Sequence, residues 1–160
     1  MELQGSRQAG GRRFALVVSS FNRDITDGLL RGARAALAEA GVHDSDISIV
    51  RVPGAFEIPL AARRLAASGR YHAVVCLGCL IKGDTMHFEY IAEAVSHGIM
   101  RVSADTGVPV TFGVLTTLTE EQAALRAADG SDNKGREAAL AAVEMTTIIE
   151  QLSGGIRNDG

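Results

Sequence analysis

The sequence predicts an α/β fold, a three-layer α/β/α sandwich around a four-stranded parallel sheet. Apolar, β-branched runs alternate four times with amphipathic helical segments. The runs are apolar throughout, as in parallel strands that are covered by helices on both faces. A length of 160 residues suits a single core. We therefore expect a mobile, Gly-rich tail over residues 1–12 and one domain over residues 13–160.

The first strand is expected in the run RFALVVSSFN, residues 13–22. The following segment, residues 24–41, has the 3.6-residue periodicity of a helix and carries Gly41 as its C-terminal stop. One face of this helix is apolar and consists of Ile25, Leu29, Ala33, Ala36, Leu37 and Ala40. Because such a face packs against a sheet, the first unit is a strand followed by a helix.

Three further units repeat this order. Strands are expected over residues 47–56, 72–81 and 109–117, and helices over residues 57–69, 86–107 and 119–128. A last helix over residues 135–152 closes the chain. The helix over residues 86–107 has an apolar stripe of Ile91, Ala94, Val95, Ile99 and Val102. Such a stripe suits either the core of this chain or contact with another subunit.

Charge and hydropathy exclude several classes of protein. The chain has 16 Lys and Arg against 19 Asp and Glu, a net charge of −3, and no basic block that would attract nucleic acid. No stretch approaches the roughly 18 consecutive apolar residues of a membrane span. Residues 1–13 lack the apolar segment of a secretory signal. We therefore expect a cytoplasmic protein without nucleic-acid or membrane partners.

Cys76 and Cys79 form a C-x-x-C pattern inside an apolar strand. A redox pair would sit at a helix N-terminus instead, where the dipole lowers the thiol pKa. Residues three apart on a strand face opposite sides, and the chain has no further cysteines to complete a zinc site. The pattern indicates buried structural thiols and no bound metal.

Polar and aromatic residues gather where the expected strands end, which is where parallel sheets bind ligands. The ends of the first three strands carry Phe21, Asn22, Gly54, Phe56, Glu57, Gly83, Thr85 and His87. Each has a structural alternative when taken alone: Phe21 as a core residue, Glu57 as a partner of a helix dipole, and His87 as a surface or capping residue. Their convergence on one rim favours a binding site.

The segment GCLIKGDT, residues 78–85, is close to a phosphate-binding loop but not a Walker motif, because Lys82 precedes the second glycine. The free N–H groups at the start of the next helix still suit an anion. We expect Gly83, Asp84 and Thr85 to hold a phosphate, with the Asp84 carboxylate capping the helix and pointing away. Arg126 and Lys134 flank a later break in the chain, where solvated charges are the alternative.

Five motifs together resemble the lumazine synthase family: SSFN, PGAFEIP, GCLIKGDTMHFEYI, PVTFGVLTT and NKGREAALAAVEM. The resemblance implies a flavodoxin-like sandwich and an enzyme of riboflavin biosynthesis. Such an enzyme condenses 5-amino-6-ribitylaminouracil with 3,4-dihydroxy-2-butanone 4-phosphate. The products are 6,7-dimethyl-8-ribityllumazine, phosphate and water, and no cofactor is needed.

The resemblance also implies residue roles. His87 matches the proposed general base. The pyrimidine and ribityl groups would contact Phe21, Asn22, Ala55, Phe56, Glu57, Leu80, Ile81, Phe112 and Lys134, and the phosphate would contact Gly83, Asp84, Thr85 and Arg126. Phe112, Arg126 and Lys134 match residues that reach the site from a neighbouring subunit.

The resemblance further implies a homo-oligomer, either a cyclic pentamer or a shell of sixty subunits, with riboflavin synthase as a partner. Gly130 stands where icosahedral members often have a lysine, so the sequence does not decide between the pentamer and the shell. Asp84 adds a carboxylate beside the phosphate site, so the sequence does not predict how tightly this site binds phosphate. A non-catalytic flavin or lumazine carrier is the alternative function, and a flavodoxin-like FMN or receiver module is a third. His87, Arg126 and Lys134 favour the enzyme.

Overall fold

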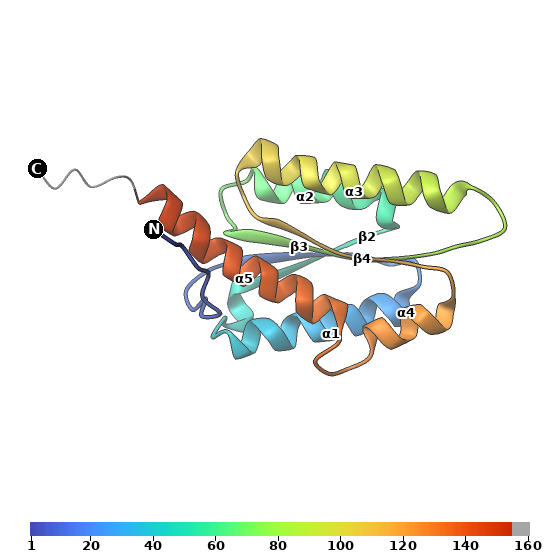
Figure 1. Cartoon of the computed structure of the whole chain (residues 1–160), viewed down its shortest axis with the longest axis horizontal. Helices are drawn as coiled ribbons and strands as arrows, with labels where there is room; N and C mark the ends of the chain where they lie inside the picture. Colours follow the sequence, from blue (N-terminus) through green and yellow to red (C-terminus); the bar gives the residue numbers. More distant parts are fainter. Residues whose placement is uncertain (155–160) are drawn as a thin grey trace, which may run out of the picture.

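Four parallel strands form one sheet between two layers of helices in the computed structural model, which describes residues 1–154 (Figure 1). The strands are β1 (Phe14–Ser19), β2 (Ile47–Val52), β3 (Ala73–Ile81) and β4 (Val110–Thr117), in the order β2-β1-β3-β4. All three neighbouring pairs are parallel. The predicted sandwich is therefore confirmed, and residues 155–160 of the expected domain lie outside the described residues.

The helices cover both faces of the sheet. Helices α1 (Arg23–Glu39), α4 (Glu120–Ala127) and α5 (Lys134–Ser153) lie on one face, and α2 (Ile58–Ala66) and α3 (His87–Thr106) lie on the other (Figure 1). Two short 3₁₀ helices, η1 (Asp44–Asp46) and η2 (Ala55–Glu57), precede β2 and α2. The first two strands end earlier than expected, because the residues after Ser19 and Val52 turn toward α1 and η2.

The sheet divides the apolar core in two. Phe14, Leu16 and Val18 of β1 pack with α1 and α5, whereas Ala15 and Val17 pack with α2 and α3. This alternation along a strand that is buried on both faces explains why the run is apolar throughout.

The two cysteines follow the same alternation. Cys79 belongs to the cluster on the α1 face and Cys76 to the cluster on the α2 face, and both are free and buried. Burial raises the pKa of the Cys79 thiol to about 11, and it raises the pKa of Cys76 further. The prediction of buried structural thiols is confirmed.

The apolar helix faces expected from the sequence are largely buried. All six residues of the α1 face are buried. In α3, Val95, Ile99 and Val102 are buried against this chain's own sheet, Ile91 is half-buried and Ala94 is exposed. Most of the α3 stripe is therefore core of this chain, and only its margin is left for other contacts.

The segment before β1 lies against α5. The Ser6 N–H donates a hydrogen bond to Thr147 Oγ1 at 2.8 Å, and Arg7 Nε lies 2.9 Å from Glu144 Oε1. Ala9 is fully buried in the α1 side of the core. The mobility expected for residues 1–12 stays a prediction. Motion of this segment would break the contacts described here.

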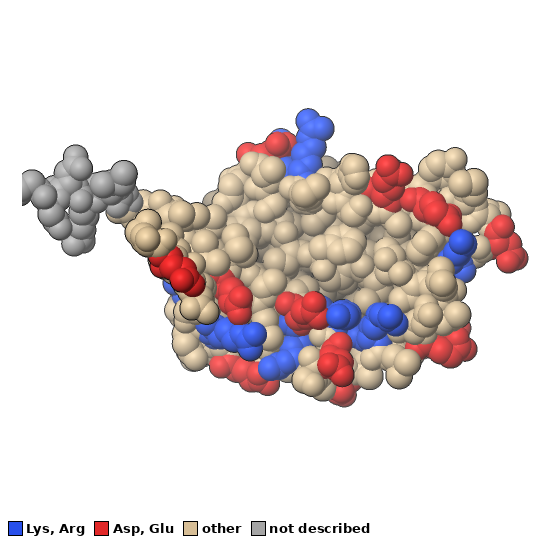
Figure 2. All heavy atoms as spheres, viewed as in Figure 1, with Lys and Arg blue, Asp and Glu red and all other residues tan. Residues whose placement is uncertain are grey.

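Charged side chains are unevenly distributed on the face shown in Figure 2. Residues of both signs are interspersed over the layer of α1, α4 and α5, whereas a largely uncharged band crosses β4 and the adjoining part of α3 (Figure 2). None of the helices within residues 1–154 is long and apolar enough to cross a membrane.

Candidate active site

The carboxyl ends of β1 and β3, together with η2 and the start of α3, enclose a cavity of about 420 Å³. We call it the rim cavity. Its lining includes eleven of the residues that the sequence singled out: Phe21, Asn22, Gly54, Ala55, Phe56, Glu57, Leu80, Ile81, Gly83, Thr85 and His87. Cys79, Phe88 and Ile91 also line it and were not expected, because apolar residues beside a motif are indistinguishable from core residues in the sequence.

Backbone contacts on both sides of Phe21 fix the position of its ring. The Phe21 N–H donates to the carbonyl oxygen of Pro53 at 3.0 Å. The next residue, Asn22, has φ 58° and ψ 50°, and its Nδ2 donates to the carbonyl oxygen of Cys79 at 3.2 Å. The ring itself is 70% exposed, so the alternative that Phe21 is a core residue is wrong. An aromatic face is thus available to a ligand in the rim cavity.

Glu57 lies in the short helix η2 at the opposite side of the rim cavity. Its Oε2 accepts a hydrogen bond from the Gly54 N–H at 3.1 Å. This bond holds the carboxylate against the residue that precedes η2. Ala55 is buried beneath it, and Phe56 is exposed. The segment therefore presents a fixed carboxylate and an apolar ring, which suits a polyhydroxylated chain attached to a flat ring system.

The loop between β3 and α3 carries the expected phosphate ligands. Gly83 and Thr85 line the rim cavity, whereas Asp84 does not. Met86 is the N-cap of α3, and no side chain caps this helix. The expectation that Asp84 caps the helix is wrong, because Asp84 lies two residues before the N-cap and its carboxylate does not reach the first N–H groups. His87 is the first residue of α3.

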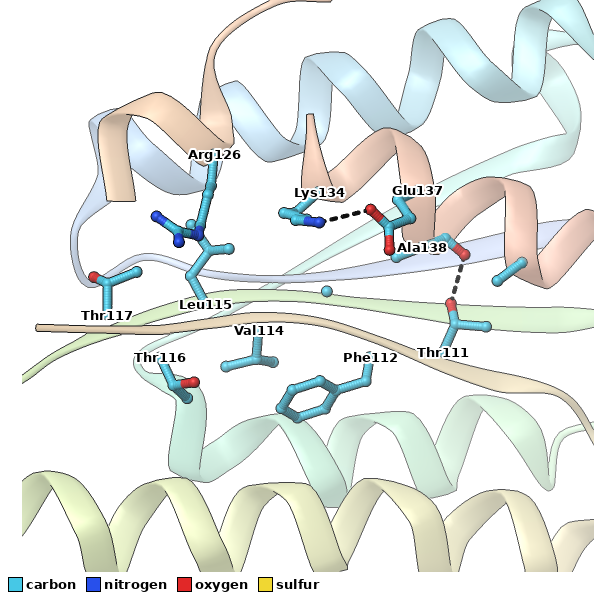
Figure 3. A pocket seen from close by; sticks show the side chains of 12 residues that line it. Thr111, Phe112, Val114, Leu115, Thr116, Thr117, Arg126, Lys134, Glu137 and Ala138 are labelled. Atoms are coloured by element: carbon cyan, nitrogen blue, oxygen red, sulfur yellow. Dashed lines mark hydrogen bonds and ion pairs between the residues drawn. The ribbon is translucent and has the colours of Figure 1, made fainter. Parts of the chain in front are cut away.

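A second cavity of about 330 Å³ lies along β4, one of the two edge strands of the sheet. We call it the edge cavity. Figure 3 shows the side chains of Arg126 and Lys134 on the α5 side of β4 and the Phe112 ring on the side that faces α2 and α3. Lys134 Nζ lies 2.8 Å from Glu137 Oε2, a partner that sequence reasoning missed although it follows at helical spacing.

The structure does not bring all the expected site residues together in one chain. No residue of the described part of the chain lines both cavities. Among residues 1–154, the lining of the rim cavity includes no lysine or arginine, although Gly83 and Thr85 lie there. Arg126 and Lys134 line the edge cavity instead. One chain thus keeps the Phe21 ring and the His87 imidazole apart from the cationic groups.

Asn133 anchors the part of the chain that carries these cationic groups. Its side chain is buried, and Nδ2 donates to the carbonyl oxygens of Gly28, Ala127 and Ala128 at 3.1, 3.0 and 3.1 Å. Its Oδ1 accepts a hydrogen bond from the Arg136 N–H at 3.0 Å and so caps α5. Asn133 was not among the residues expected at the site, although an asparagine directly before a helix is a common N-cap.

Comparison with known proteins gives one consistent match. The family model for 6,7-dimethyl-8-ribityllumazine synthase matches residues 11–150. A protein of that name from Desulfotalea psychrophila is 51% identical over 150 residues, which cover 94% of this chain and 97% of the relative. Another from Syntrophus aciditrophicus is 50% identical over 149 residues, with 93% and 97% covered. The matched residues include the linings of both cavities.

Proposed function

The chain belongs to the 6,7-dimethyl-8-ribityllumazine synthase family, and we propose on this basis how its residues perform the family's reaction in riboflavin biosynthesis. The enzyme is a transferase that joins 5-amino-6-ribitylaminouracil to 3,4-dihydroxy-2-butanone 4-phosphate. The observation that carries the proposal is the rim cavity, in which the exposed ring of Phe21, the carboxylate of Glu57 and the imidazole of His87 line one space.

The pyrimidine substrate fits the rim cavity by its shape and polarity. Its flat ring would stack on Phe21, whose exposed face is held by the turn after β1. The ribityl hydroxyls would bond to the Glu57 carboxylate and to backbone groups of Ala55 and Phe56. Backbone groups near Leu80 and Ile81, at the end of β3, would recognise the ring edge.

His87 suits the proton transfers of the reaction. The amine and the ketone form an imine, phosphate is eliminated, and ring closure completes the product. Each step moves protons, and an imidazole can donate or accept them near neutral pH. Because the amine is already a good nucleophile, holding both substrates in the correct orientation accounts for much of the acceleration. This effect contributes up to roughly 7–11 kcal/mol in favourable cases.

The active site is, in this proposal, completed by a neighbouring subunit. A phosphate held by Gly83 and Thr85 in the rim cavity needs a cation, and the lining of that cavity supplies none among the described residues. Arg126 and Lys134 lie along the open edge strand β4, where a neighbouring chain can approach them. The edge cavity of one copy would therefore face the rim cavity of the next.

Such a head-to-tail contact generates a closed ring when the rotation between neighbouring copies closes, and an open filament when it does not. The uncharged band over β4 and α3 is a suitable surface for the contact (Figure 2). A pentameric ring is the size that the family resemblance implies, and a shell of such rings, riboflavin synthase as partner and a cytoplasmic location stay predictions.

The alternative of a non-catalytic lumazine or flavin carrier has no support from the relatives, which are named as synthases. A carrier would have no use for a phosphate site beside the stacking ring. The receiver alternative fails because acidic residues do not gather after β1, where the chain reads SSFN.

The test is a reaction of the purified chain with both substrates, followed by the absorbance of the lumazine and by an assay for released phosphate. We expect one phosphate for each lumazine, and no product when either substrate is omitted. Binding of the pyrimidine without turnover would instead support a carrier.

A further inference from the structure

An ion pair links the two ends of the loop that carries the expected phosphate ligands. Lys82 directly follows β3, and Glu89 lies in the first turn of α3. Lys82 Nζ lies 3.2 Å from Glu89 Oε1, so the pair bridges residues 83–88, which are the loop residues 83–86 and the first two residues of α3. Neither side chain belongs to the lining of the rim cavity or of the edge cavity.

The Glu89 carboxylate depends on this pair for its orientation. Its Oε2 is buried and has no hydrogen-bond partner among residues 1–154. Its own backbone N–H and the Lys82 ammonium together hold the pKa of the Glu89 carboxyl below its usual range. Glu89 is therefore charged at neutral pH, and Lys82 is the side chain that fixes it.

Other contacts hold the loop weakly. The Lys82 N–H donates to the carbonyl oxygen of Thr117 at 2.9 Å and anchors the start of the loop to β4. At its end, the His87 N–H lies 3.4 Å from Thr85 Oγ1, which is beyond the usual hydrogen-bond distance. A side chain at Gly83 would meet nothing within 4 Å, so the surroundings do not restrain that residue.

We infer that Lys82 and Glu89 are positioning residues, which hold the loop over residues 83–86 in the conformation that binds the phosphate of the butanone substrate. This inference rests on the proposed function. The physical reason is entropic: a loop that is ordered before binding loses less conformational freedom when the phosphate arrives. Neither residue needs to touch the phosphate.

The direction in which phosphate binding changes when the Glu89 charge is removed distinguishes a positioning role from a purely electrostatic one. Removal of the negative charge of Glu89 from the neighbourhood of an anion should tighten phosphate binding if charge alone matters. If the carboxylate holds the loop through Lys82, the same change should weaken phosphate binding. Glu89→Gln is therefore the informative variant, because it keeps the shape of the side chain and removes its charge.

The experiment measures kcat and the KM of each substrate for Glu89→Gln, Lys82→Met and the double variant. We expect each single change to raise the KM of the butanone phosphate about three-fold, as for an exposed ion pair. The KM of the pyrimidine and kcat should stay unchanged. The double variant should be no worse than the worse single variant, since both changes remove the same contact. Lys82→Arg should preserve the pair and the wild-type KM.

The matched control removes an exposed ion pair far from the loop, Arg34 Nη2 with Asp44 Oδ1 at 2.8 Å, through Arg34→Met and Asp44→Asn. These changes should leave both KM values as they are. A lower or unchanged KM in Glu89→Gln, or effects that add fully in the double variant, would overturn the inference. Failure of the wild-type chain to form product would contradict the proposed function instead, so the two failures are distinguishable.

Discussion

The side-chain amide of Asn22 donates a hydrogen bond to the carbonyl oxygen of Cys79 over 3.2 Å and so joins the turn after β1 to the C-terminal part of β3. Asn22 is also the one residue other than glycine with a positive φ among residues 1–154. A left-handed residue at this point turns the chain sharply into α1 and leaves the preceding ring, Phe21, beside the rim cavity.

Replacement of Asn22 should reveal the backbone strain. Asn22→Ala loses the hydrogen bond and leaves in the left-handed region a residue without the polar side chain that makes this region tolerable for asparagine, which costs about 1–2 kcal/mol. Asn22→Gly loses the same bond without that strain. We expect Asn22→Ala to lower the free energy of unfolding by about 1 kcal/mol more than Asn22→Gly does, measured by urea denaturation. If both variants lost the same free energy of unfolding, the left-handed backbone conformation at residue 22 would make no difference to stability.

Phe21→Ala should affect ligand binding far more than stability. The ring is 70% exposed, so little apolar contact in the folded chain is lost. Stacking on a flat ligand contributes on the order of 1 kcal/mol beyond its buried area. Calorimetric titration with a lumazine analogue should show the weaker binding, while the melting temperature stays nearly constant. A large fall in melting temperature with unchanged affinity would contradict this role.

His87→Ala should retain measurable turnover. The loss should lie at or below the ~10²–10⁴-fold range for removal of a general acid or base, because orientation of the two substrates is unaffected. Steady-state assays on properly assembled protein measure this. Complete loss of activity in the His87 variant would mean that proton transfer dominates catalysis.

Asn133→Ala should be strongly destabilising. It leaves three carbonyl oxygens without their shared donor, two of them in buried hydrogen bonds, and removes the cap of α5. Unsatisfied buried groups and a lost cap together cost about 3 kcal/mol or more. Asn133→Asp keeps the cap acceptor but points a carboxylate at those carbonyl oxygens, so it should also destabilise. Thermal unfolding of both variants measures the effect, and a neutral Asn133→Asp would contradict the role of Nδ2.

The sequence was sufficient for the elements and for most of the rim cavity. Apolar, β-branched runs identified β1 to β4, and the ends of the first three strands carried Phe21, Glu57 and His87, which the structure brings to one cavity. Chain order does not reveal spatial order, so the position of β4 at the open edge and the separate edge cavity came only from the structure. The contacts of Asn133 and of Ser6 join segments that are distant in sequence, and local patterns carry no signal for them.

The central claim is that the rim cavity of one copy and the edge cavity of the next form one active site. It is tested most directly by subunit complementation. Subunits with Phe21→Ala and His87→Ala are mixed in equal amounts with subunits carrying Arg126→Ala and Lys134→Ala, then unfolded and refolded together. Random assembly into head-to-tail rings should restore about a quarter of the sites, because one site in four receives two intact halves. Activity near that fraction of wild type supports the shared site. Mixed rings without recovered activity, or a fully active monomer, would contradict it.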